Sequence, residues 1–194
     1  MSSGSLKEFL HELSRRVGEG KVLTEPEELY SYSLDASTEF KRPPVAVVRA
    51  SSEEDVRAVL ELADRSKVPV VPRGSGTSLT GGPVPAVPNA IILDLTPMNR
   101  IEVNVDDGYV MAEAGATLLE VDKACREYGF FFPPDPASSR IATVGGAIAE
   151  NAGGLRGAKF GVMKNWILAM EVILPGGRRL RIGEPVYKWR WGPD

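Results

Sequence analysis

Cysteine and histidine are almost absent from this sequence, and their scarcity excludes two kinds of site. The 194 residues include one cysteine and one histidine. A single cysteine cannot form a disulfide within the chain, and the two side chains together fall short of the ligands of a structural zinc site. We therefore expect a fold without internal disulfides and without a metal site.

The sequence also lacks an excess of either charge and any long apolar run. Its 23 basic and 26 acidic residues leave a net charge of −3, which is too balanced for a surface that binds nucleic acid. No apolar run approaches the roughly 18 residues that cross a membrane, and the first residues lack the charged and apolar stretches of a signal peptide. These absences predict a cytoplasmic protein that neither binds nucleic acid nor spans a membrane.

Glycine and proline are abundant instead. The 20 glycines and 15 prolines exceed the average share but stay below that of disordered chains. The sequence is therefore expected to fold with many turns. Much of the glycine is concentrated in three segments, residues 74–82, 145–161 and 176–177.

Hydrophobic periodicity predicts a first lobe of helices and strands. Apolar residues recur at helical spacing over 5–17, and Pro26 favours the first turn of a short second helix. A strand at 45–48, a helix opened by Ser52 and a strand at 68–71 form a strand–helix–strand unit. The two strands of such a unit should be parallel.

The pattern then changes to strands with short connections. The elements expected here are strands at 91–95, 101–105 and 110–114, a helix opened by Thr117, a short helix over 143–151 and a hairpin of 166–174 with 178–182. This order predicts an α+β fold: a small lobe that contains the βαβ unit and a larger, mostly antiparallel lobe with flanking helices.

The first glycine-rich segment, Arg73–Gly82, has the composition of a phosphate-binding loop. Glycines allow consecutive backbone N–H groups to turn toward one point, and Ser75, Thr77 and Ser78 add hydroxyl donors. The segment follows the second strand of the βαβ unit, where α/β sheets place ligands. It lacks the lysine of a Walker loop and the third glycine of a Rossmann fingerprint, which disfavours the common ATP and NAD sites. A flexible surface loop is the alternative.

The second segment, Pro133–Gly154, is rich in small residues where a helix is expected. A helix built from adjacent glycines and alanines is poor by propensity. Small residues are tolerated where something flat lies against the backbone, with polar contacts here from Asp135, Thr143 and Asn151. Tight packing between two elements of the protein is the alternative.

Taken in order, several motifs of this sequence resemble a known family. They are Pro72-Arg-Gly-Ser-Gly-Thr-Ser-Leu-Thr-Gly-Gly82, Ala112-Glu-Ala-Gly-Ala116, Pro134-Asp-Pro136, Thr143-Val-Gly-Gly146, Asn151-Ala-Gly-Gly154 and Phe160-Gly161. The sequence is similar to the FAD-binding (PCMH-type) domain of the vanillyl-alcohol oxidase/p-cresol methylhydroxylase superfamily, and most of all to the branch of D-lactate dehydrogenase and the FAD-binding subunit of glycolate oxidase. The resemblance implies a helical segment over 1–29, an FAD-binding domain over 30–194, and flavin-dependent oxidation of a 2-hydroxy acid such as D-lactate or glycolate.

The resemblance also implies which residues hold FAD, between the two lobes. The pyrophosphate would contact the backbone and hydroxyls of Pro72, Arg73, Gly74, Ser75, Gly76, Thr77 and Ser78. The flavin side would be approached by Asp135, Pro136, Thr143, Gly145 and Gly146, and the ribityl chain and ring by Asn151, Gly153 and Gly154. Thr77 stands where some relatives carry a histidine bonded to the flavin, so FAD is expected to be non-covalent. His11 is expected on the surface of the first helix, and Cys125 is expected to be a packing thiol.

The sequence departs from the family at its end. Residues 188–194 match only the first part of a family motif, and relatives continue with a closing strand, a substrate-binding domain and a segment that carries catalytic bases and metal ligands. We therefore expect that the chain alone is inactive, and that a second chain supplies the substrate domain or the chain self-associates.

Two alternatives stay open. They are an FAD-binding accessory subunit and a truncated remnant, each without its own catalysis. Independently of these, the alternative interpretation of Trp189, Arg190 and Trp191 is a basic-aromatic interaction tail. The sequence identifies neither catalytic residues nor the hydroxy acid that is oxidised.

Overall fold

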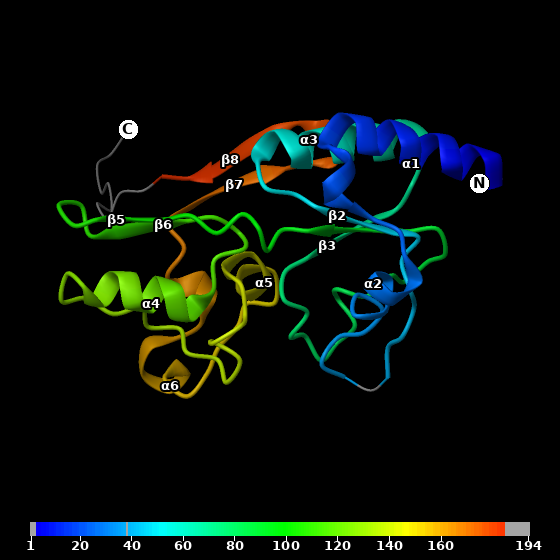
Figure 1. The fold of residues 1–194 in the computed structure, drawn as a ribbon. Coiled ribbons are helices and arrows are strands. Elements are labelled where there is room, and N and C mark those ends of the chain that lie inside the picture. Colours follow the sequence, from blue (N-terminus) through cyan, green and yellow to red (C-terminus); the bar gives the residue numbers. More distant parts are fainter. Residues whose placement is uncertain (1–2, 38, 185–194) are drawn as a thin grey trace, which may run out of the picture.

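Two lobes lie side by side in the computed structural model, which describes residues 3–37 and 39–184 (Figure 1). The motif at 188–194 lies outside the described residues. The first lobe contains α1 (Ser3–Val17), η1 (Glu19–Lys21), β1 (Val22–Leu23), α2 (Pro26–Tyr30), β2 (Ala46–Arg49), α3 (Glu53–Ser66), β3 (Val70–Arg73) and β4 (Ile91–Asp94). The second contains β5 (Ile101–Asn104), β6 (Tyr109–Ala112), α4 (Leu118–Arg126), α5 (Val144–Ala149), α6 (Gly157–Phe160), η2 (Met163–Asn165), β7 (Ala169–Ile173), η3 (Pro175–Gly177) and β8 (Arg179–Gly183).

The first lobe is built on a four-stranded sheet with the order β1-β2-β4-β3. Strands β2 and β3 are parallel, as predicted, but β4 lies between them and pairs in parallel with both. The assignment of residues 91–95 to the antiparallel lobe was therefore wrong. All four residues of β4 are buried, because helices cover both faces of a central parallel strand. The connection from β4 to the next strand is short, and this favoured an antiparallel assignment when the sequence alone was considered.

Alternate residues of the sheet face two different helical layers. Ala46 and Val48 of β2 pack with α1 and α3 on one face, while Val47 packs with Leu29 of α2 on the other. This period of two follows from the pleat of a strand. Helix α1 shares the core of α3 through Leu13, so the helical segment at 1–29 packs on the same sheet as the rest of the lobe.

The second lobe has its own core, which lies between its helices and the β5–β6 ribbon. Strand β5 pairs with β6 and β7 pairs with β8, as predicted. Thr117 opens α4, as predicted, and it does so through a capping box with Glu120. Cys125 of α4 is buried in this core, and burial raises the pKa of its thiol. The α+β fold with two lobes is confirmed.

The β7–β8 hairpin connects the two lobes. It runs along the top of both in Figure 1, and its turn, η3, packs against α3. Arg57 of α3 donates from Nε to the carbonyl oxygen of Gly177 at 3.2 Å. The hairpin therefore ties the second lobe to the helical layer of the first.

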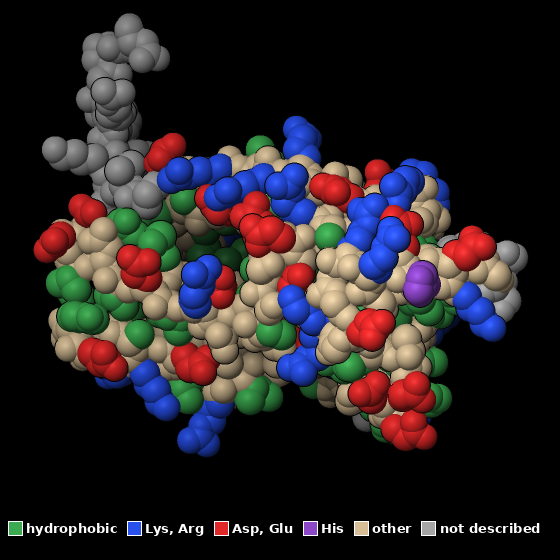
Figure 2. Space-filling model, turned by 45° about the horizontal axis from the view of Figure 1, so that its top comes forward, with side chains coloured by type: hydrophobic (Ala, Val, Ile, Leu, Met, Phe, Trp, Pro, Cys, Tyr) green, Lys and Arg blue, Asp and Glu red, His purple; other side chains and the backbone are tan. Residues whose placement is uncertain are grey.

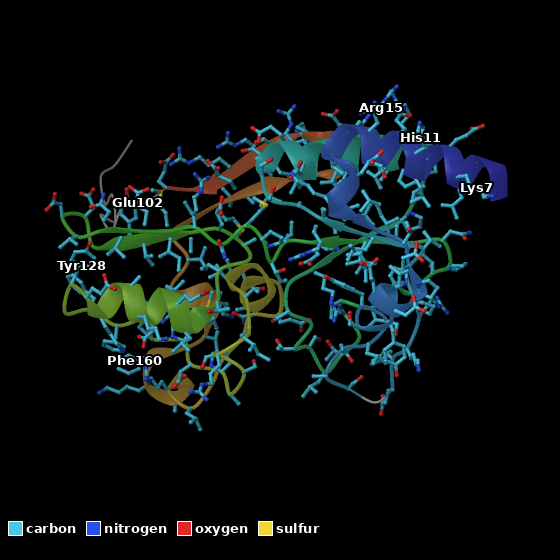
Figure 3. All side chains as sticks on the ribbon, in the orientation of Figure 1. Lys7, His11, Arg15, Glu102, Tyr128 and Phe160 are labelled. Atoms are coloured by element: carbon cyan, nitrogen blue, oxygen red, sulfur yellow. The ribbon has the colours of Figure 1, made fainter. Side chains whose placement is uncertain are left out.

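The surface carries both charges in close mixture. Figure 2 shows basic and acidic side chains interspersed over the face that it presents. His11 is exposed on α1, as expected, beside Lys7 and Arg15 (Figure 3). Within 3–37 and 39–184, no helix is long and apolar enough to cross a membrane. The same residues contain no cluster of three or more His, Cys, Asp or Glu side chains suited to a metal ion.

Candidate functional site

The loop after β3 presents a run of backbone N–H groups that the described part of the protein leaves unused. No hydrogen bond joins the N–H groups of residues 74–79 to any other described residue. The loop begins at the carboxyl end of a parallel strand, where ligands of open α/β sheets bind. A run of free N–H groups of this kind suits the oxygens of a phosphate. The loop therefore fits the diphosphate that the sequence predicts for it.

The second half of this loop is anchored by the segment that follows α2. The carboxylate of Asp35 accepts hydrogen bonds from the N–H of Gly81 and the N–H of Ser37, both at 2.8 Å. The N–H of Ala36 donates to the carbonyl oxygen of Ser78 at 3.0 Å. Burial would raise the pKa of Asp35, but the hydrogen bonds from Ser37 and Gly81 hold it below its ordinary value. The loop is therefore held in place although its N–H groups are open.

The start of the loop is held by the side chain of Arg73. This side chain is buried, and its guanidinium donates to the carbonyl oxygens of Leu34 at 2.8 Å and Pro83 at 3.1 Å. Gly76 lies directly against the guanidinium, since a Cβ there would come within 2.2 Å of an Arg73 nitrogen. The Arg73 side chain therefore contacts the protein interior and is not free to contact a ligand.

Thr143 brings the two glycine-rich segments together. This residue is buried at the start of α5, and a Cβ on Gly74 would lie 2.0 Å from its Oγ1. Only glycine at position 74 permits this approach. A second contact joins the same elements, because Ser78 Oγ donates to a carboxylate oxygen of Glu150 at 3.1 Å.

The N–H groups in the first turn of α5 are already used by the protein. The N–H of Val144 donates to Ala116 O at 2.8 Å and that of Gly145 to Ala114 O at 2.8 Å. The N–H of Gly146 donates to Thr143 Oγ1 at 3.4 Å. A Cβ on Gly145 would lie 2.9 Å from the Cβ of Ala114. Tight packing, the alternative reading of this segment, therefore accounts for Gly145.

Asp135 and Pro136 lie against Gly154. A Cβ on Gly154 would lie 1.8 Å from the carbonyl oxygen of Asp135 and 2.6 Å from the nitrogen of Pro136. The carboxylate of Asp135 is 3.4 Å from Nε of Arg156. The structure thus brings the predicted residues together in two groups: the loop with Thr143, and Asp135–Pro136 with Gly154.

Asn151 lies beside a cavity on the other side of α5. The cavity measures about 380 Å³ and lies between the end of α5 and the β7–β8 hairpin, with Ile148, Asn151 and Met170 among its lining residues. Oδ1 of Asn151 accepts a hydrogen bond from the N–H of Lys164 at 3.0 Å. Gly153 is half-buried, and no described residue accepts a hydrogen bond from its N–H or from that of Gly154.

Three contacts of the site were not predicted from the sequence. They are the Asp35 anchor, the interior position of the Arg73 guanidinium and the contact of Glu150 with Ser78. Asp35 carried a signal, because Asp-x-Ser is a common sequence for a side chain that bonds to the backbone two residues later. The other two depend on residues that are distant in sequence and carry no local pattern.

Comparison with known proteins gives a matching family and several relatives. A sequence profile of the family described as FAD binding domain matches residues 44–183. The chain is 37% identical over 158 residues to glycolate oxidase subunit GlcD of Bacillus subtilis, covering 81% of this chain and 33% of that protein. It is 39% identical over 162 residues to D-lactate dehydrogenase of Archaeoglobus fulgidus, covering 81% of this chain and 36% of that protein. The chain thus spans about a third of the length of these relatives.

A solved structure of p-cresol methylhydroxylase with substrate bound has the same fold. The TM-score is 0.84 at 23% identity, and the match covers 100% of this chain and 40% of that one. At this identity the likeness concerns the fold alone. It confirms the two-lobed arrangement that the sequence predicts.

Proposed function

The chain belongs to the FAD binding domain family, and from this membership we propose that it forms the FAD-binding part of a flavin-dependent oxidoreductase acting on a 2-hydroxy acid. FAD is the cofactor that the family binds, and glycolate and D-lactate, the acids in the names of two relatives, are both 2-hydroxy acids. One observation carries the proposal on this chain: the open N–H groups of residues 74–79 beside Thr143. They supply a diphosphate site in a loop that the protein already holds in place.

The loop binds the diphosphate through its backbone in this proposal. Pro72–Ser78 surround the phosphates, and the glycines at 74 and 76 allow the chain to turn without side chains that would block approach. Asp135, Pro136, Thr143 and the helix that contains Gly145 and Gly146 form the flavin side. When bound, FAD supplies the ring that takes up two electrons from the hydroxy acid, while the protein supplies binding and orientation.

Asn151, Gly153 and Gly154 line the approach to the ribityl chain in the same proposal. FAD is held without a covalent bond, because Thr77 has no ring nitrogen to offer and the single histidine of the sequence, His11, lies on α1. The domain is assigned to residues 30–194. A second chain that supplies the substrate domain is part of the proposal, since one relative is named a subunit. Self-association and a cytoplasmic location stay predictions.

A flavin titration tests the proposal. Addition of FAD to the purified protein should shift the flavin absorption bands and quench flavin fluorescence to a saturating level. With the substrate domain also present, D-lactate or glycolate added anaerobically should then bleach the bound flavin, whereas the matching 2-oxo acids should not. The chain alone should bind FAD without bleaching.

The same spectra separate the alternatives. FAD that binds but does not bleach with either acid, even when the substrate domain is present, indicates an accessory subunit. A protein that leaves the flavin spectrum unchanged at saturating FAD contradicts the proposal, because the open N–H groups of the loop then have no cofactor to bind.

A further inference from the structure

The guanidinium of Arg73 is held by three segments that are distant in sequence. It donates to Ser31 O at 3.3 Å and Leu34 O at 2.8 Å in the segment after α2, and to Pro83 O at 3.1 Å beyond the loop. The side chain as a whole is 8% exposed. Since Arg73 is the last residue of β3, this one side chain connects the strand, the far end of the loop and the segment that anchors the loop.

The charge of Arg73 forms no direct ion pair within the described residues, and the carboxylates of Asp94 and Asp35 act on it only through space. No carboxylate of 3–37 or 39–184 lies within 4 Å of it, and its hydrogen bonds go to neutral carbonyl oxygens. The Tyr32 ring lies 5.5 Å away, but burial and then the hydrogen bond to Asp94 raise the pKa of Tyr32 to about 12. Tyr32 is therefore neutral near pH 7. Arg73 stays charged, although burial lowers its pKa.

The nearest buried carboxylate is directed elsewhere. Asp94 accepts from Tyr32 Oη at 2.8 Å and lies 3.6 Å from Nε of Arg49. Its second oxygen accepts from the N–H and the hydroxyl of Thr96. A buried cation without a direct ion pair is costly, and a further anion close to it lowers that cost. The open N–H groups of the loop lie next to this cation, because Gly76 rests against the guanidinium.

We propose that Arg73 is the positioning residue of the diphosphate loop: its guanidinium fixes the backbone of residues 74–78 from the interior, and its unpaired charge attracts the diphosphate without touching it. The inference rests on the proposed function, since the anion is the diphosphate of FAD. Gly76 has a φ of +75°, one of several conformations that glycine adopts without strain. Contact with the Arg73 guanidinium selects this one. Charge and geometry thus come from one side chain.

Two variants of Arg73 and one matched control test this role. Arg73→Met removes the charge and all the donors, whereas Arg73→Lys keeps the charge and loses the planar fork. The control is Arg57→Met, which removes another arginine of the first lobe that donates to a carbonyl oxygen, remote from the loop. Two quantities are measured: hydrogen exchange in the free protein of the amides of Ala36 and Gly81, whose hydrogen bonds hold the loop to the segment after α2, and the dissociation constant for FAD.

Arg73→Met should speed exchange of these two amides and weaken FAD binding by about tenfold to a hundredfold, the size expected when one nearby positive charge is lost from partly buried surroundings. Arg73→Lys should recover a clear part of the FAD affinity, because the positive charge remains. Arg57→Met should match the unmodified protein in both measurements. A purely structural role predicts no recovery by lysine, and that result overturns the proposed attraction.

The remaining outcomes are also decisive. FAD affinity of Arg73→Met equal to that of the unmodified protein overturns the proposal. If Arg73→Met lacks a cooperative thermal transition, Arg73→Lys decides: faster exchange of the two amides than in the control supports the positioning role, and unchanged exchange overturns it. Failure of the unmodified protein to bind FAD would count against the proposed function, while the exchange data alone would still decide whether Arg73 fixes the loop.

Discussion

The two glycine-rich segments have similar compositions and opposite hydrogen-bonding states. In the loop after β3, the N–H groups of residues 74–79 have no acceptor among the described residues. In the first turn of α5, the N–H groups of Val144, Gly145 and Gly146 are all bonded within the protein. The loop therefore retains hydrogen bonds to give to a ligand, and the first turn of α5 has none to give.

This difference separates two uses of glycine. At Gly145 and Gly154 the missing Cβ permits close contact with other backbone of the same protein. At Gly76 it permits a left-handed turn that leaves consecutive N–H groups open. Composition alone indicates that something approaches closely. What distinguishes a protein neighbour from a cofactor is whether the backbone N–H groups are hydrogen-bonded within the protein or left without an acceptor.

The largest expected effect is a loss of stability in the first turn of α5, where the glycines pack against the protein. Gly145→Ala places a Cβ 2.9 Å from the Cβ of Ala114 and 3.1 Å from its carbonyl oxygen, and overpacking of this kind costs about 1–3 kcal/mol. Gly146→Ala is the matched control, because its Cβ meets only Thr143 Oγ1, at 3.2 Å. Thermal unfolding should show a clear loss for Gly145→Ala and a smaller change for Gly146→Ala. Equal losses would mean that the two glycines do not differ in packing.

In the loop after β3, a matched pair of variants should separate the effect on FAD affinity from the effect on stability. Gly76→Ala and Gly108→Ala both place an alanine at positive φ, at +75° and +69°, which should cost about 1–2 kcal/mol of stability in each, and Gly76→Ala adds a clash between its Cβ and the Arg73 guanidinium. Gly108 lies in the β5–β6 turn with no atom within 4 Å of its Cβ position. Only Gly76→Ala should also weaken FAD binding, because it displaces the loop from Arg73. FAD titrations on both variants check this, and a similar loss of affinity in Gly108→Ala would contradict it.

The smallest effect concerns the acid limit of the anchored loop. The pKa of Asp35 is lowered in the folded protein, so its contribution to stability is fully present above the ordinary value of 3.8 and is lost as the pH falls through the lowered value. Asp35→Asn should therefore melt at a lower temperature than the unmodified protein at pH 7, and the gap should close in acid. A gap that stays constant in thermal melts from neutral to acid pH would show that the carboxylate charge does not anchor the loop.

Local signals predicted most of the fold. Thr117 and Glu120 form the capping box that their spacing indicates, and both antiparallel hairpins follow their turn sequences. The insertion of β4 between β2 and β3 was not predictable in this way, because strand order depends on contacts between distant residues. The hydrophobic pattern of a short buried strand such as β4 does not indicate which sheet the strand joins.

The site was predictable in its location and less so in its chemistry. The loop at 74–78 follows a parallel strand, as its composition suggested, and meets Thr143 of the second segment. Its assignment to FAD came from the order of motifs rather than from any single residue. The interior role of Arg73 could not be seen in sequence, since its acceptors at Ser31 and Pro83 come from two separate segments of the chain.

The contact between η3 and α3 has a consequence for the synthesis of the chain. Arg57 and Gly177 are 120 residues apart, and ribosomes add about 5–20 residues per second. The face of α3 that receives the hairpin therefore waits about 6–24 s for its partner. During that interval the first lobe can assemble its own sheet and core, while the connection between lobes is still to be made. Substitutions in the turn of the β7–β8 hairpin, which is synthesised late, should therefore affect the rate at which the lobes join more than the rate at which the first lobe folds.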